Sequence, residues 1–292
     1  MFTSIFTNKN KLKAGAHFAG LSCLLFISFS LLCVSQVRAQ GNLLISPHRV
    51  VFEGQKRVME INLANTGQDS AKYTVSFLQY KMKEDGSFEE ITAPEPGLNF
   101  ADKNVRVFPR TVMLGPNESQ VIKLQLTKSD ELTPGEYRSH IYFRAIANQK
   151  ALGEEDVKKD SSAISIKLVA VFGITIPVII RIGESTTTLK LTDLKMEKGA
   201  DGINRLLLSI NRSGNMSAYG DITILYKAPS GTETQIGLVN GVAVYTPLEL
   251  RKMKIDLDNK SNLDLSKGTI HAVFSSTDDT HPVKLAEAEL AL

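Results

Sequence analysis

The feature that most constrains the fold of this chain is a series of short segments in which apolar and polar residues alternate. Residues 58–63 read Val-Met-Glu-Ile-Asn-Leu, and residues 121–126 read Val-Ile-Lys-Leu-Gln-Leu. Successive side chains of a strand point to opposite faces, so this alternation is typical of strands with one buried face. Turn residues such as Asn65-Thr66-Gly67 and Gly115-Pro116-Asn117 separate the segments. The pattern predicts an all-β protein.

The predicted strands fall into two series. The first series comprises residues 45–52, 58–63, 71–82, 105–108, 121–126, 137–147 and 163–182. The second comprises seven shorter segments at residues 189–196, 203–210, 220–228, 233–239, 248–257, 269–275 and 283–290. Seven short strands at such spacing are typical of an immunoglobulin-like sandwich. We therefore predict two immunoglobulin-like β-sandwich domains, at residues 40–183 and 184–292.

Residues 1–39 have the pattern of an export signal that is removed from the mature protein. Lys9, Lys11 and Lys13 form a basic start, an apolar run follows, and Val37-Arg38-Ala39 places small residues before a cut at Gln40. Two alternatives are an uncleaved membrane anchor and a lipid attached to Cys33. The uninterrupted apolar core is shorter than the ~20 residues that a membrane-spanning helix needs, which favours cleavage.

Removal of this leader changes the chemistry of the chain. Both cysteines, Cys23 and Cys33, lie within it, so the mature protein is expected to fold without disulfides. The leader holds four basic residues and no acidic one, which leaves 30 basic and 31 acidic residues, a net charge of −1. No overall basic field remains to indicate a nucleic-acid partner. Nothing in the sequence indicates a cofactor.

Residues 163–182 form the longest apolar segment of the mature chain. Its even positions are mostly large and apolar, and it contains Lys167, Gly173 and Pro177 together with many β-branched residues. These features favour one long strand, or two strands in line, over a membrane helix. The polar residues 148–162 before it are expected to form a long loop.

Several segments of the first series resemble the PapD-like periplasmic chaperones that assemble pili. Residues 45–54, Ile-Ser-Pro-His-Arg-Val-Val-Phe-Glu-Gly, are similar to the first strand of that family and its glycine turn. The Pro-containing segment 108–119 and the ending Tyr142-Phe143-Arg144-Ala145-Ile146 also resemble family segments. The resemblance covers residues 43–182. For the second domain it is limited to length and strand number.

This resemblance implies that the long strand is donated to a partner. In the family, a pilus or fimbrial subunit lacks one strand, and the chaperone's strand fills the open groove before delivery to an outer-membrane usher in the periplasm. The implied donor residues here are Ile164, Ile166, Leu168, Ala170 and Phe172. Self-association through the same edge strand is expected when no client covers it. The alternative is an ordinary strand whose even face is buried in its own domain.

The resemblance also implies an anchor for the client's C-terminal carboxylate. Arg49 matches the family's basic residue on the first strand. The family's second basic residue is a lysine, and its position here is taken by Pro177, four residues before Arg181. This departure is closer to the divergent, non-classical branch of the family. Arg181 or Lys167 is the candidate for the second charge, and we predict Arg49 and Arg181 as the carboxylate-binding pair.

No pattern in the sequence indicates an enzyme. The histidines are scattered without the spacing of a metal site, and the chain contains no nucleophile-elbow, P-loop or His-Glu-x-x-His motif. We interpret the protein as a chaperone for incomplete pilus or fimbrial subunits. The alternative is a structural or adhesive cell-surface sandwich protein in which the long strand is internal.

Overall fold

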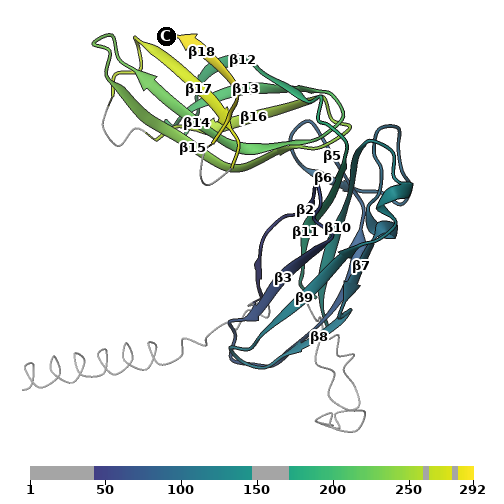
Figure 1. Cartoon of the computed structure of the whole chain (residues 1–292). Helices are drawn as coiled ribbons and strands as arrows, with labels where there is room; N and C mark the ends of the chain where they lie inside the picture. The colour runs from purple at the N-terminus through teal and green to yellow at the C-terminus, as the bar shows by residue number, and fades with distance from the viewer. Residues whose placement is uncertain (1–42, 147–170, 259–262, 278–281) are drawn as a thin grey trace, which may run out of the picture. The chain divides into compact units, whose positions relative to one another are not determined.

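The computed structural model describes residues 43–146, 171–258, 263–277 and 282–292 (Figure 1). This part of the chain contains eighteen strands and two short 3-10 helices, η1 (Asp102–Asn104) and η2 (Ser129–Glu131). The predicted all-β fold is confirmed. Over the same residues, no helix has both the length and the apolar character required to cross a bilayer. The predicted export signal lies outside the described residues.

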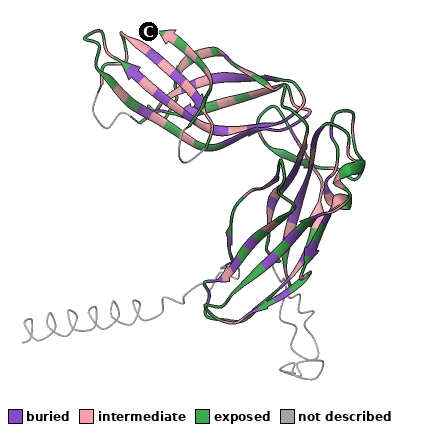
Figure 2. Ribbon diagram, in the orientation of Figure 1, coloured by how far each residue is buried: buried purple, intermediate pink, exposed green. Residues whose placement is uncertain are grey.

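Nine strands form the first sandwich. One sheet has the order β1 (Leu43–Ser46), β3 (Val58–Asn65), β9 (Ser119–Leu126), β7 (Val105–Phe108). The other has the order β2 (Val50–Phe52), β11 (Gly173–Ile182), β10 (Gly135–Ile146), β4 (Ala71–Leu78), β8 (Thr111–Leu114). Buried and exposed residues alternate along the strands, as Figure 2 shows. The inward residues of both sheets, among them Ile61, Leu124, Ile141 and Phe143, make one apolar core.

The first predicted strand, residues 45–52, is two strands in the structure. β1 pairs antiparallel with β3 in one sheet, whereas β2 pairs parallel with β11 in the other. Pro47 lies between the two, where the chain passes from one sheet to the other. Proline has no backbone N–H to give to a ladder, so a strand is expected to break there. The first predicted strand therefore contributes β1 to one sheet and β2 to the other.

Seven strands form the second sandwich, and each coincides with one of the seven predicted segments. Their bounds are β12 (Thr188–Lys198), β13 (Asn204–Ser213), β14 (Ala218–Lys227), β15 (Glu233–Val244), β16 (Leu250–Asp256), β17 (Thr269–Ser275) and β18 (Lys284–Ala291). The sheets have the orders β12-β13-β16 and β15-β14-β17-β18, and their inward residues make a second core. The predicted domain boundary at residues 183/184 falls between β11 and β12 and stays a prediction.

A hairpin between β4 and β7, formed by β5 (Tyr80–Met82) and β6 (Phe88–Glu90), contacts the second sandwich. The backbone N–H of Lys252 donates to the carbonyl oxygen of Glu84 at 2.7 Å, and the Lys252 ammonium pairs with the Glu84 carboxylate at 2.7 Å. Met82 is buried in a small apolar cluster with residues of β11 and β15. Residues 41–292 accordingly form one compact unit.

Candidate functional site

The described part of β11 has a free edge over half of its length. On one side, residues 173–182 pair with β10 throughout. On the other side, β2 pairs only with residues 178–180, and no described strand pairs with residues 173–177. Unpaired backbone groups on such an edge are a template for a further strand. β11 is thus half central strand and half edge strand.

An apolar row on β11 continues past the end of the core. Ile176, Val178 and Ile180 lie on the inward face and are at most 4% exposed. Phe172 and Ile174 have the same parity, yet they are 49% and 37% exposed. The inward face of this strand therefore carries large apolar side chains beyond the point where its own sandwich covers them.

Pro177 lies where the free edge meets β2. The N–H of Ala145 donates to the carbonyl of Phe172 at 2.9 Å, so even-numbered residues of β11 direct their backbone groups to β10. Odd-numbered residues then direct theirs to the opposite edge. Gly173 and Thr175 offer N–H donors there, and Pro177 has none to offer. A proline with its missing donor toward the open side is a feature of edge strands, so Pro177 limits pairing at this point.

Arg49 directly precedes β2 and lies between two tyrosines of the second sandwich. Its guanidinium carbon is 4.4 Å from the ring centre of Tyr219 and 5.6 Å from that of Tyr245. The guanidinium also donates to the Tyr245 hydroxyl at 3.4 Å. Burial lowers the pKa of Arg49. Within the described residues, no carboxylate forms an ion pair with it.

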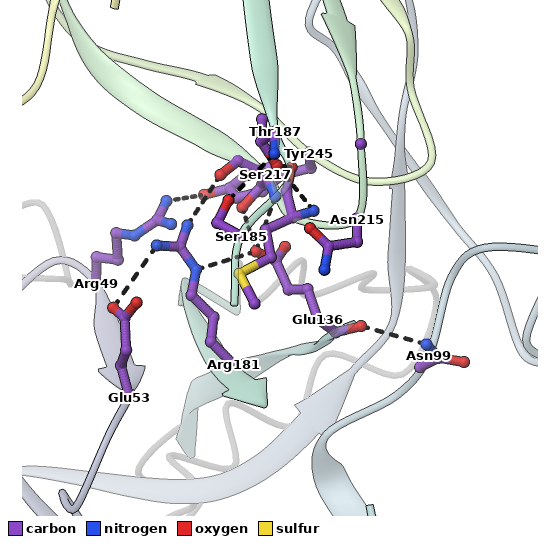
Figure 3. Close-up of polar contacts among 12 residues, drawn as sticks. Arg49, Glu53, Asn99, Glu136, Arg181, Ser185, Thr187, Asn215, Ser217 and Tyr245 are labelled. Carbon is purple, nitrogen blue, oxygen red and sulfur yellow. Dashed lines mark hydrogen bonds and ion pairs between the residues drawn. The ribbon is translucent and has the colours of Figure 1, made fainter. Parts of the chain in front are cut away.

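Arg181 is brought close to Arg49 but is already engaged (Figure 3). Its Nε donates to the carboxylate of Glu136 at 3.3 Å, and its Nη2 donates to the carbonyl of Ser217 at 2.9 Å. The carboxylate of Glu53 lies 3.7 Å from Nη1. Glu136 also accepts from the backbone N–H and the hydroxyl of Ser217, at 2.9 and 2.6 Å. These contacts join β10 and β11 to the second sandwich.

Sequence reasoning did not single out Arg138, which is 2% exposed on β10. Its guanidinium lies 4.4 Å from the Tyr245 ring centre, on the ring that also contacts Arg49. One nitrogen donates to the carbonyl of Thr246 at 3.3 Å, while Nε and Nη1 are buried without a hydrogen-bond partner in the described part of the chain. Burial, with a smaller effect of Arg138, lowers the pKa of the adjacent His140 to about 3, so this ring is neutral.

The cluster of Arg49, Arg138 and Arg181 therefore has more positive than negative charge. Glu136 is the buried carboxylate among them, and Glu53 is 59% exposed. Buried charges are ordinarily paired, because an unpaired charge is costly in a medium of low polarity. An anion placed beside Arg49 would reduce this imbalance. The geometry thus brings the two predicted arginines together, and of these two, Arg181 has carboxylate partners whereas Arg49 has none among the described residues.

Comparison with known proteins gives distant matches of fold. No protein-family model matches the chain, and no curated protein does. The YadV chaperone is 12% identical, with 86% of this chain and 100% of that chain covered and a TM-score of 0.43. The Pseudomonas aeruginosa CupB2 chaperone is 12% identical, with 85% and 100% covered and a TM-score of 0.43. The E. coli chaperone DraB is 14% identical, with 85% and 96% covered and a TM-score of 0.42.

Most of the predicted donor residues lie outside the described residues. This applies to Ile164, Ile166, Leu168 and Ala170, whereas Phe172 is described and exposed. Its backbone continues the pairing of β11 with β10. The donor role of these residues stays a prediction. Lys167, the other candidate for a second charge, also lies outside the described residues. No group of three or more metal-binding side chains occurs where the structure describes the chain.

Proposed function

We propose that this protein is a periplasmic chaperone that holds incomplete pilus or fimbrial subunits by giving them a strand. The observation that carries the proposal is the half-free strand β11. On the edge that faces away from β10, no described strand pairs with residues 173–177, and the apolar side chains of Phe172 and Ile174 are 49% and 37% exposed. Long apolar edges invite aggregation, and proteins usually suppress them unless a partner covers them. A subunit with an open groove needs both the free strand edge and the exposed apolar side chains, because it lacks a strand and the core residues which that strand would supply.

The position of β2 suggests how the client strand runs. β2 is parallel to β11 and occupies the edge from residue 178 onward. A client strand in line with β2 would be parallel to β11 and would end beside Arg49, the residue before β2. Its terminal carboxylate would then meet the open guanidinium, where a charge-assisted hydrogen bond can form. Arg138, which contacts the Tyr245 ring, would add positive charge to the site. Arg181 would stay paired with Glu136.

Co-expression tests the proposal. The chain should be produced with sandwich subunits encoded beside it, and the complex recovered from the periplasm by a tag on the chaperone. We expect a one-to-one complex in which the subunit is protected from proteolysis. If the protein instead remains attached to the cell surface and recovers no subunit, it is a structural or adhesive protein and the proposal is wrong.

Replacement of Arg49 tests the anchor. Arg49→Ala should weaken client binding by about 1.5–3 kcal/mol, the usual value of a hydrogen bond to a charged group. This corresponds to roughly a 10- to 150-fold rise in Kd. Competition with a labelled client measures the change. Arg110→Ala, at an exposed residue between β7 and β8, is the control and should bind like the parent. Equal binding by the Arg49 variant would remove this residue from the site.

A further inference from the structure

Tyr142 of β10 lies across the neighbouring strand β11 at Gly173, on the outward face of the sheet. Its outward direction follows from its neighbours in the chain, because Ile141 and Phe143 are fully buried in the core. In the register of the two strands, Tyr142 is opposite Thr175, so Gly173 is its diagonal neighbour. Diagonal positions are within reach of aromatic side chains. The ring of Tyr142 therefore extends from β10 to the first residue of β11.

The far end of this ring occupies the space that a side chain at residue 173 would fill. A Cβ atom added to Gly173 would overlap ring carbons of Tyr142 and would lie 2.5 Å from its hydroxyl oxygen. A glycine within a strand often marks a position where another group approaches the backbone closely. Here that group is an aromatic ring, and Tyr142 is itself only partly buried.

The position of the ring matters because Gly173 belongs to the free edge of β11. On the side away from β10, no described strand pairs with residues 173–177. A strand added there would direct every second side chain to the outward face, the face on which Tyr142 lies. The added side chain next to Gly173 would find no side chain of β11 beside it. Its neighbour on this face would be the ring of Tyr142.

The two faces of this edge would then contact an added strand in different ways. On the inward face, the exposed side chains of Phe172 and Ile174 are the groups that would enter the groove of a client. On the outward face, the surface next to Gly173 is the ring of Tyr142. A glycine at an edge covered by an aromatic ring from the neighbouring strand is a known stabilising arrangement in sheets.

We propose that Tyr142 is a specificity-determining residue, whose ring packs against an aliphatic side chain on the outward face of the client's edge strand. Pairs of aromatic and β-branched side chains on the same face of a sheet are favourable. The inference rests on the proposed function, because its ligand is the client strand that pairs with β11. It adds recognition of the outward face to the filling of the client groove on the inward face.

Binding of a subunit to variants at the two positions tests this contact. The probe is the subunit recovered by co-expression, labelled and titrated with purified chaperone variants. Tyr142→Ala should raise the Kd about threefold to tenfold, a range typical of losing one such aromatic contact, and Tyr142→Phe should bind like the parent. Gly173→Ala should raise the Kd by a similar factor, because the added methyl group displaces the ring. In the Tyr142→Ala background, Gly173→Ala should have almost no further effect.

Ser76→Ala, on β4, is the matched control. Ser76 is exposed and is paired with Tyr142 on the side away from β11, so this variant should bind like the parent. Thermal melts of the free variants establish that each is folded at the temperature of the titration. Additive effects at residues 142 and 173, or equal binding by Tyr142→Ala and the parent, would overturn the inference and leave the chaperone function in place. A parent chain that captures no subunit would overturn both.

Discussion

Replacing Phe172 and Ile174 together with Asp should abolish client capture and leave the free protein nearly as stable as the parent. Both side chains are substantially exposed, so few contacts of the sandwich core are lost. A client groove would have to accept two charges among apolar side chains, which is prohibitive without partners for them. Pull-down of a subunit and a thermal melt of the same variant measure the two effects.

The control variant changes Ile176, which lies two residues after Ile174 in the apolar row of β11. Ile176 is 4% exposed and belongs to the core of the first sandwich. Ile176→Asp should therefore lower the free energy of unfolding by more than about 4 kcal/mol, since it buries an unpaired charge. If the Phe172 and Ile174 variant unfolds like the Ile176 variant, the row is internal throughout and the strand is not donated. If the exposed pair is changed and capture persists, the client binds elsewhere.

Alternation in the sequence was sufficient to predict most strands but not all of them. The seven segments of the second sandwich follow the period-two pattern, and each is a strand. β6 was missed because it is three residues long and exposed throughout. β8 was missed because Met113 on its exposed face is apolar, so the sequence Thr-Val-Met-Leu shows little alternation of apolar and polar residues. Their pairing with β5 and β4 decides their conformation.

The arginine cluster shows what a strand pattern cannot reveal. Arg49 was predicted from its motif, but Glu136 and Arg138 were not singled out. On β10, Ile141 and Phe143 face the core, so residues of even number are expected to face solvent. Glu136, Arg138 and His140 are nevertheless buried, because they contact Ser217, Thr246 and Tyr245 of the second sandwich. Burial by another sandwich is a tertiary effect, and no local periodicity records it.

Glu136→Gln should lower the free energy of unfolding by about 3 kcal/mol, measured by urea denaturation. The carboxylate is fully buried and accepts three hydrogen bonds, from Arg181 and from the backbone and hydroxyl of Ser217. Removing one member of a buried charge pair leaves the other uncompensated, which usually costs about 3–5 kcal/mol. The lower value is expected because Arg181 keeps Glu53 and the Ser217 carbonyl. Glu53→Gln, at the exposed partner, should cost less than about 1 kcal/mol.

The Glu136→Gln variant also distinguishes an effect on the stability of the protein from an effect on the binding of the client carboxylate. Loss of Glu136 increases the excess positive charge around Arg49, so a client carboxylate should bind at least as tightly per folded molecule. Adding Arg181→Met should recover part of the lost stability, because the uncompensated charge is then removed as well. A double-mutant cycle with no coupling would show that the pair does not stabilise the contact between the sandwiches. A parallel loss of stability and client affinity in the Glu136 variant would mean that Glu136 positions Arg49, so the anchor would depend on the whole cluster instead of on Arg49 alone.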